Sequence, residues 1–562
     1  MRRTAYALFM GVVLVLTLGV AAPAQAGRAD PGKGPEVTYR VKEMIRGAPI
    51  HGANGLAIDA QGRLLVASVF GGELVAVNPR TGKVTQRLGH EVGVDGPDDV
   101  AIGPDGSVYW TDILAGEVGR LAPDGTSSKQ FVAPGVNPIA FNEDGRLFVG
   151  QAFFGDGLYE VDPQLVNLPR TVISDSATPP FITQLNGFDF GADGMLYAPQ
   201  PFLGQIVRID PESGGLSAVA EGLPFTTSVE FNAKGQLFAG LGDGRIVTVD
   251  TDTGKIDTVA RIKRASSLDN MVFDAKGRLY VSDAHTGAVF VIGRGGGVRR
   301  LVKGGLILPG GIAVMPRTAR SESLFVADVW RLVEYDARSG RRIDIDASDF
   351  TNPSGIIGPW TVAPDGGNVI LTYGGANTVQ VWDPHADEVV ETYTDFVFPW
   401  NALRFGDDLV VAEVGTGSVV AQDSAGVRTT LAGGLTWPGG LAATDTDLWV
   451  ADWATGQIHQ ITGVGAPQVV ASGLNLPEGM AVDRDGSLLV VESGAGKLTR
   501  IDLATGDKST VADGLATDVQ GPAALVAGEM NGVAVDRTGT ILVSAAGSEG
   551  SVVYRIKAVP AR

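Results

Sequence analysis

Residues 55–79 read GLAIDAQGRLLVASVFGGELVAVNP, and this pattern is repeated along the rest of the chain. Three short runs rich in Leu, Val and Ala are separated by turns that contain Gly62 and Gly71-Gly72. Short apolar runs bounded by glycine-containing turns predict β-strands joined as hairpins. The stretch therefore predicts a small antiparallel sheet whose strands follow one another along the chain.

The same unit recurs twelve times, at intervals of 39 to 53 residues. The copies begin at Gly55, Asp99, Pro138, Gly187, Ser228, Asn270, Gly311, Trp360, Asn401, Gly440, Gly479 and Gly532. A period of roughly 40 residues, built from short alternating strands, is typical of four-stranded propeller blades. Segments such as STVADGL (509–515) supply the fourth strand before the next copy begins. We therefore predict an all-β chain of two consecutive six-bladed β-propellers.

Two strand-like segments belong to no complete copy, and they divide the chain into two rings. VTYRVKEMIRG (37–47) precedes the first copy, and VRRLVKGGL (298–306) follows the glycine-rich stretch 293–297. The sixth and twelfth copies each stop after a third strand. Pairing a lone strand into an incomplete last blade closes a ring and removes exposed sheet edges. We expect 37–47 to close a first ring over 35–294, and 298–306 to close a second over 295–562.

The N-terminus and the composition predict an exported protein. Two arginines, an apolar run over 5–20 and Ala24-Gln25-Ala26 indicate a signal peptide over 1–26, followed by a flexible stretch over 27–34. No later run approaches the roughly 20 apolar residues that cross a bilayer, so we expect no membrane anchor. The formal charge of −19 disfavours nucleic acid, and zero cysteines exclude disulfides. The predicted location is secreted, either extracellular or periplasmic.

The residue just before each copy's first strand is expected at the mouth of a propeller channel. In the first half these residues are Asn54, Asp98, Asn137, Asn186, Thr227 and Asp269; in the second they are Gly310, Pro359, Trp400, Gly439, Glu478 and Asn531. Asn and Asp also favour turns, but turn chemistry predicts similar usage in both halves. A ring of amide and carboxylate oxygens suits calcium. The asymmetry predicts Ca²⁺, or another divalent cation, in the first ring.

The blade pattern and two segments resemble the propeller family of gluconolactonase, regucalcin and the luciferin-regenerating enzyme, and more distantly paraoxonase and strictosidine synthase. LNGFDF (185–190) is similar to the family's Asn-Gly metal segment, and LDNMVFD (268–274) to its Asp-Asn segment. The resemblance implies calcium ligands at Asn54, Asn137, Asn186 and Asp269, with Asn270 beside them. The family's first-blade ligand is usually Glu, where this chain has Asn54.

The resemblance implies hydrolysis of a lactone or related ester. A carboxylate would take a proton from water, and we assign this role to Asp269, with Asp98 in reserve and His51 as a further candidate. No G-x-S-x-G elbow, glycine-rich phosphate loop or HExxH helix occurs in the sequence, so water is the expected nucleophile. In the second half, Trp360 and Trp400 are candidates for binding a substrate ring.

Two other functions remain open because a propeller fold does not fix its function. The chain also resembles NHL-repeat propellers, which would imply a non-enzymatic module that binds a protein, peptide or glycan. A lyase resembling virginiamycin B lyase is a third interpretation, although no convincing His and Glu pair supports the elimination. The sequence leaves the substrate, the identity of the metal, the oligomeric state and the role of the second ring undetermined.

Overall fold

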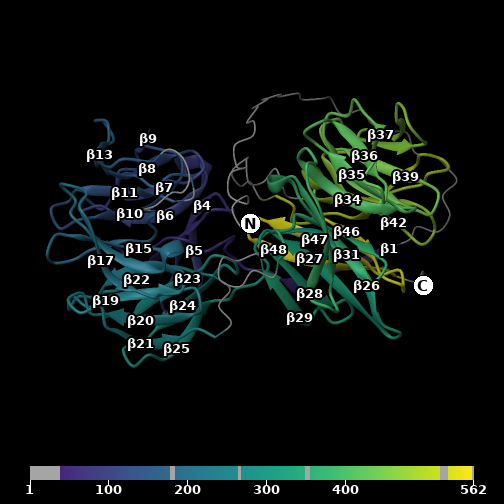
Figure 1. Ribbon diagram of the computed structural model, residues 1–562. Helices are drawn as coiled ribbons and strands as arrows, with labels where there is room; N and C mark the ends of the chain where they lie inside the picture. Colours follow the sequence, from purple (N-terminus) through teal and green to yellow (C-terminus); the bar gives the residue numbers. More distant parts are fainter. Residues whose placement is uncertain are drawn as a thin grey trace.

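The computed structural model describes residues 38–152, 154–176, 184–263, 267–347, 355–518 and 530–559. The predicted signal peptide and flexible N-terminus lie outside these residues. The described strands form twelve four-stranded antiparallel sheets, six in each of two propellers that lie side by side (Figure 1). The predicted fold class is confirmed. No helix within the described ranges is long and apolar enough to span a bilayer.

The first propeller contains six blades whose four strands are consecutive in the chain. They are β2 (Leu56–Ile58), β3 (Leu64–Ser68), β4 (Glu73–Val77), β5 (Val84–Leu88); β6 (Pro97–Ile102), β7 (Val108–Asp112), β8 (Glu117–Leu121), β9 (Ser127–Phe131); β10 (Val136–Phe141), β11 (Leu147–Gln151), β12 (Leu158–Val161), β13 (Arg170–Ile173); β14 (Asp189–Phe190), β15 (Leu196–Gln200), β16 (Gln205–Ile209), β17 (Leu216–Glu221); β18 (Thr226–Phe231), β19 (Leu237–Leu241), β20 (Arg245–Val249), β21 (Ile256–Arg261); and β22 (Leu268–Phe273), β23 (Leu279–Asp283), β24 (Ala288–Ile292), β25 (Val298–Val302).

The second propeller contains five blades of consecutive strands and a sixth that uses β1 (Thr38–Arg46) from the N-terminal end. The other strands are β26 (Pro309–Thr318), β27 (Ser321–Asp328), β28 (Arg331–Asp336), β29 (Arg342–Ala347); β30 (Thr361–Asp365), β31 (Asn368–Tyr373), β32 (Thr378–Asp383), β33 (Glu388–Tyr393); β34 (Pro399–Phe405), β35 (Asp408–Glu413), β36 (Ser418–Gln422), β37 (Arg428–Ala432); β38 (Pro438–Ala443), β39 (Leu448–Asp452), β40 (Gln457–Ile461), β41 (Gln468–Ala471); β42 (Pro477–Val482), β43 (Leu488–Glu492), β44 (Lys497–Ile501), β45 (Lys508–Ala512); and β46 (Val533–Val535), β47 (Ile541–Gly547), β48 (Gly550–Val559). Single 3-10 turns η1 (His90–Val92), η2 (Pro201–Leu203), η3 (Gly374–Ala376) and η4 (Ser493–Ala495) follow some of the strands.

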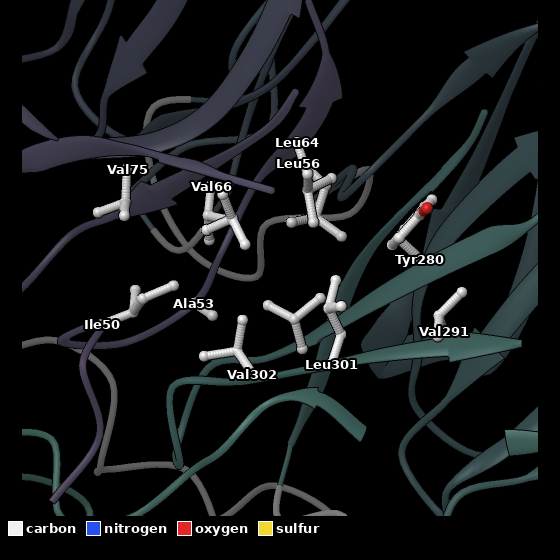
Figure 2. Packing of buried hydrophobic residues seen from close by; sticks show 12 residues of the cluster. Ile50, Ala53, Leu56, Leu64, Val66, Val75, Tyr280, Val291, Leu301 and Val302 are labelled. Atoms are coloured by element: carbon white, nitrogen blue, oxygen red, sulfur yellow. The ribbon is translucent and has the colours of Figure 1, made fainter. Parts of the chain in front are cut away.

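The first ring closes by packing its last blade against its first, without exchanging a strand. The innermost strands β2 and β22 contact each other, as neighbouring inner strands do around the ring. Behind them Leu64 and Val66 of the first blade pack against Tyr280, Val291 and Leu301 of the sixth (Figure 2). Burying this apolar surface stabilises the closed ring by the hydrophobic effect, since no ladder of hydrogen bonds joins the two blades.

The prediction of which strand completes the last blade is wrong for both rings. β1 pairs antiparallel with β48, from Thr38↔Val559 to Arg46↔Val552, and so completes the second ring. β25 pairs with the strand directly before it, through a turn in which the Gly293 carbonyl accepts a hydrogen bond from Gly296 N–H. A short turn makes pairing with the preceding strand entropically cheap. The first ring therefore extends beyond the expected boundary, to Val302.

The two propellers contact each other through an apolar cluster at the channel-mouth side of the first ring. Phe70 and Ile113 from the first ring lie with Ile307 and, partly buried, Trp330 from the second. The Phe70 and Trp330 rings meet edge to face, with centroids 6.1 Å apart. The second ring therefore contacts the face of the first that carries the predicted axial residues.

Candidate metal site on the axis of the first propeller

Amide side chains surround a carboxylate at the mouth of the first ring. Asn54 Nδ2 donates to Asp98 Oδ1 at 3.0 Å, and Asn137 Nδ2 donates to Asp98 Oδ2 at 2.9 Å. Asp98 and Asn137 are buried, whereas Asn54 and Asp269 are half-buried. The structure therefore brings residues from the first three blades together, as the sequence predicts. Asp269 lies close enough to influence this group, as its pKa shows below.

A second layer lies one residue further along the inner strands. Asp99 accepts hydrogen bonds from Asn270 Nδ2 at 2.8 Å and from the backbone N–H of Ile139 at 3.2 Å. The β6–β7 register shifts between Pro97 and Val100, and this irregularity lets two successive carboxylates, Asp98 and Asp99, join the axial network. In a regular strand only every second residue faces the axis, whereas the irregularity turns two successive residues toward it. The alternation of the sequence therefore predicts fewer polar side chains at the axis than the structure has.

Glycines leave the space that this layer occupies. A Cβ built on Gly187 would lie 2.5 Å from Asn270 Oδ1, and one on Gly55 would lie 2.4 Å from Asp99 Oδ1. Both distances are shorter than any normal contact. Gly187 follows Asn186, whose Oδ1 accepts a hydrogen bond from the Gly187 N–H at 2.9 Å. Glycine in the Asn-Gly segment is therefore required by close packing across the axis.

Two further carboxylates, neither of them predicted as a metal ligand or catalytic residue, continue the acidic column. Asp189 accepts hydrogen bonds from the backbone N–H groups of Phe190 and Phe231, each at 2.8 Å. Glu230 Oε1 accepts one from Phe273 N–H at 3.4 Å. Asp189 lies three residues after the mouth position Asn186, and Glu230 three residues after Thr227. A search for acidic residues along the full length of each inner strand would find both.

The axial carboxylates all have raised pKa values. Burial raises the pKa of Asp98 to about 7, and the charge of Asp112 adds to the effect. Burial, reinforced by the Asp98 charge, raises the pKa of Asp99 to about 7 as well. The pKa of Asp269 is raised well above its usual range by burial and then by the charges of Asp98 and Asp99.

The deeper pair shows the same behaviour. Burial raises the pKa of Asp189 to about 6, while burial and the Asp189 charge raise the pKa of Glu230 well above its usual range. The groups that lower these pKa values, here and at the mouth, are amides and backbone N–H groups rather than cations. The column therefore holds several acidic groups without a matching positive charge.

The residues present fit a hard cation. Asn54 Oδ1 and Asn270 Oδ1 are buried oxygens without a hydrogen-bond partner among the residues that the structure describes, and unpaired buried polar atoms are rare in native proteins. Calcium accepts amide and carboxylate oxygens, so these two atoms and the uncompensated carboxylates are a suitable donor set. No group of three or more His, Cys, Asp or Glu side chains in the described parts of the chain is arranged to hold a metal on its own. A site here would depend on the asparagines.

The structure does not bring His51 to the channel. Its side chain is 1% exposed and lies between the rings, with Nε2 2.9 Å from the Gly547 carbonyl oxygen and Nδ1 against the Ile307 carbonyl. Burial lowers its pKa. The proximity of His51 to Asn54 in the sequence suggested a catalytic role, but its ring nitrogens are directed to backbone carbonyls of the second ring.

The two tryptophans predicted to bind substrate lie at the mouth of the second ring. Trp360 and Trp400 meet edge to face, with centroids 6.0 Å apart. Trp400 is buried at 4% exposure, whereas Trp360 is half-buried. They lie on the other propeller from Asp98 and Asp269, so the structure groups the predicted site residues into two separate sites.

Comparison with known proteins supports the first-ring resemblance. Residues 98–306 match the family model of the SMP-30/Gluconolactonase/LRE-like region. No curated protein matches the chain. Virginiamycin B lyase from Staphylococcus aureus is similar in structure, at 14% identity and a TM-score of 0.37, over 51% of this chain and 95% of its own.

Two other solved structures show comparable similarity. A protein assigned to the gluconolactonases has 15% identity and a TM-score of 0.36 over 48% of this chain and 93% of its own. The extracellular domain of a protein assigned to the hybrid two-component systems of B. thetaiotaomicron has 12% identity and a TM-score of 0.32, over 92% of this chain and 82% of its own.

Proposed function

We propose that the first propeller is a calcium-dependent hydrolase of lactones or related esters, and the match of residues 98–306 to the family model of the SMP-30/Gluconolactonase/LRE-like region supports this. The observation that carries the proposal is the axial column, in which Asp98, Asp99 and Asp269 lack a cationic partner while amide oxygens of Asn54 and Asn270 lack any partner. A divalent cation would satisfy both needs at once.

The proposed ligands come from different blades of the ring. Asn54, Asn137, Asn186, Asp269 and Asn270 would hold the ion, with another divalent cation as an alternative to calcium. A bound ion of this kind supplies Lewis-acid stabilisation of the negative charge that develops on an ester carbonyl oxygen.

We assign the proton-accepting role to Asp269 rather than Asp98. Both oxygens of Asp98 already accept amide hydrogen bonds, from Asn54 and Asn137, and the side chain is only 7% exposed. Asp269 is more exposed than Asp98, so a water molecule would reach its carboxylate more readily. Asp98 then orients the two asparagines through these bonds.

Export to the extracellular space or periplasm is part of the proposal and rests on the N-terminal sequence alone. A site built largely from neutral amides binds calcium weakly, because it carries few ligand charges. Such a weak site suits the high calcium concentration outside the cytoplasm.

Calcium titration calorimetry on the chain without residues 1–26 tests the metal site. We expect about one ion per chain, a higher thermal midpoint in calcium than in chelator, and loss of both effects in Asn186→Ala and Asp269→Ala. Asn167→Ala and Asp252→Ala remove the same residue types from exposed positions of the same ring and serve as matched controls.

Activity is then measured with a panel of lactones and aryl esters. Hydrolysis that requires calcium and is lost in Asp269→Asn, while calcium binding persists, supports the proton-accepting role. Calcium binding without hydrolysis of any substrate would instead favour a binding propeller in which the metal stabilises the ring. No calcium binding, with unchanged thermal midpoints, would refute the proposal.

A further inference from the structure

Four tryptophans form a continuous arc at the mouth of the second propeller. Trp360 and Trp400 have centroids 6.0 Å apart, Trp400 and Trp437 5.4 Å, and Trp437 and Trp453 5.7 Å. They come from three successive blades, beside the start of β30, β34 and β38 and the end of β39. The first two pairs meet edge to face, at 66° and 81°, so the rings do not cover one another's faces by parallel stacking.

The arc retains accessible surface. Trp400 is buried behind the other rings, but Trp360, Trp437 and Trp453 are only partly buried. Trp437 Nε1 is shielded from solvent and has no hydrogen-bond partner within the described structure. Large aromatic faces left open at a channel mouth are typical of ligand sites rather than of a blade interior.

A buried carboxylate lies at one end of the arc. Glu478 Oε2 accepts hydrogen bonds from Asn531 N–H at 2.8 Å and Nδ2 at 2.7 Å, and the carboxylate also interacts with the side chains of Trp453 and Ser493. It is 7% exposed, and burial raises its pKa. All these donors are neutral, so the negative charge has no cationic partner among them.

A glycine lies next to the arc on the same side of the ring. Gly439 occupies the axial position beside Trp437 and Trp453, and a Cβ built on it would meet no atom closer than 3.8 Å. Its backbone does not require glycine, because no positive φ occurs there. A β-methyl group at this position would make ordinary contacts, so a side chain can be introduced here beside the aromatic rings.

We propose that the arc of four tryptophans and Glu478 form a second ligand site, which binds the alkylated ammonium head of an organic cation. Aromatic faces attract such a head through cation–π interactions, and a nearby carboxylate balances its charge. A neutral sugar would use the aromatic faces but leave Glu478 uncompensated. This site involves no residue of the first-ring metal site, so the two proposals succeed or fail separately.

Choline and tetramethylammonium are the probes, and 3,3-dimethylbutanol serves as the uncharged counterpart of choline. We expect the two cations to quench tryptophan emission saturably, and the neutral alcohol to bind at least about tenfold more weakly. Cellobiose is included to test recognition of a neutral sugar. Equal binding of choline and its neutral counterpart, binding of cellobiose alone, or no binding would each overturn the proposal.

Two variants locate the site. Glu478→Gln removes the charge while keeping the side-chain shape, and Gly439→Val places a branched side chain beside the tryptophans without removing any contact. Each is expected to lower choline affinity by about tenfold or more. Gly367→Val makes the same substitution at an exposed turn with nothing within 4 Å, and we expect it to bind as the parent does. Retained affinity in both Glu478→Gln and Gly439→Val would overturn the assignment.

Discussion

Shortening the side chain of Ile45 tests which ring the N-terminal strand completes. Ile45 lies in β1, pairs with Val553, and is 8% exposed within a cluster that includes Leu324 and Leu542 of the second ring. Replacing a buried isoleucine by alanine removes apolar contacts and leaves a cavity, at a cost of about 2–4 kcal/mol. Ile45→Ala is therefore expected to destabilise the second propeller, although the substitution lies at the opposite end of the chain.

Leu301→Ala is the matched control. Leu301 is also 8% exposed, but its strand β25 belongs to the first ring, where it packs with Tyr280 and Val291. The cost should be similar, yet it should fall on the other propeller. If 37–47 and 298–306 closed the rings as the sequence pattern suggests, the effects of the two variants would be exchanged.

Urea unfolding followed by tryptophan emission reports mainly on the second ring, because seven of the eight tryptophans lie between residues 330 and 453. With a urea dependence of about 3 kcal/mol per M, a loss of about 3 kcal/mol lowers the midpoint by about 1 M. Amide exchange then locates the change in each variant. Faster exchange in β22–β24 with unchanged β46–β48 in Ile45→Ala would refute the strand assignment.

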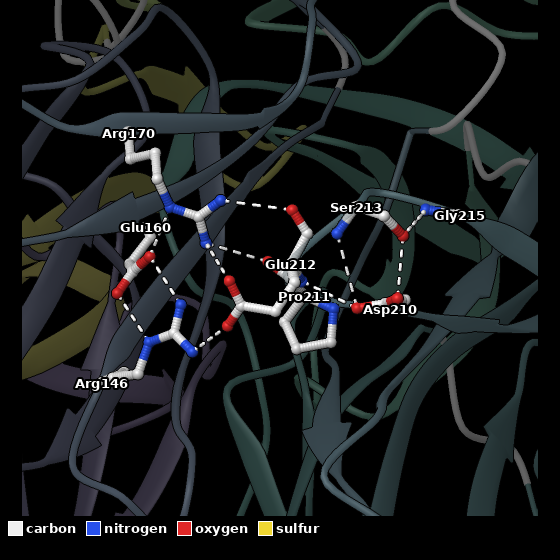
Figure 3. A network of polar contacts seen from close by, with 8 residues as sticks. All are labelled: Arg146, Glu160, Arg170, Asp210, Pro211, Glu212, Ser213 and Gly215. Carbon is white, nitrogen blue, oxygen red and sulfur yellow. Dashed lines mark hydrogen bonds and ion pairs between the residues drawn. The ribbon is translucent and has the colours of Figure 1, made fainter.

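Three further outcomes follow from buried and charged groups. His285 stacks on Trp330, and burial lowers its pKa from 6.5 to about 3, so protons bind the unfolded chain more readily. The contribution of neutral His285 to the free energy of unfolding is complete above pH 6.5 and falls by about 2 kcal/mol by pH 5. His285→Gln should remove this part of the loss of stability with falling pH, as measured by thermal melts. Gly187→Ala should lower stability by about 1–3 kcal/mol and weaken calcium binding, because its Cβ would collide with Asn270. Arg146→Ala, in the network that joins the third and fourth blades (Figure 3), should cost at most about 1 kcal/mol in urea unfolding, and less at high salt.

Each of these outcomes has a result that would contradict it. An unchanged pH slope in His285→Gln would mean that other groups dominate acid destabilisation. A Gly187→Ala chain with parental stability and calcium affinity would mean that the axis accommodates a methyl group. A salt-independent loss in Arg146→Ala would point to the contact of the Arg146 guanidinium with Phe148, whose ring centroid lies 5.3 Å from the guanidinium carbon.

The repeat number and the blade strands are predictable from sequence because they depend on short-range patterns. The strand between Gly55 and Asp59 and its eleven counterparts combine apolar alternation with nearby turns, and both signals lie within a few residues. Ring closure depends on a choice between distant partners. The segments 37–47 and 298–306 look alike, and the turn at Gly293–Gly297 decides between them by pairing β25 locally.

The candidate site could be predicted only at its rim. Asp98 and Asn137 begin or precede inner strands, so the repeat alignment brings them together. Asp189 and Glu230 lie deeper, and recognising them requires knowing which way each residue of the strand faces. The position of His51 depends on contacts with the second ring, and no local pattern in the sequence encodes those contacts.

The pairing of β1 with β48 also has a consequence for biosynthesis. During synthesis β1 precedes all strands of the first propeller, and its partner β48 follows the other strands of the second. The whole first propeller can therefore form before β48 exists to pair with β1. Throughout that interval β1 carries unpaired backbone groups, and the nascent second ring keeps an open blade. A chain that stops before β48 would therefore expose the backbone groups of β1, which could pair with a strand of another chain.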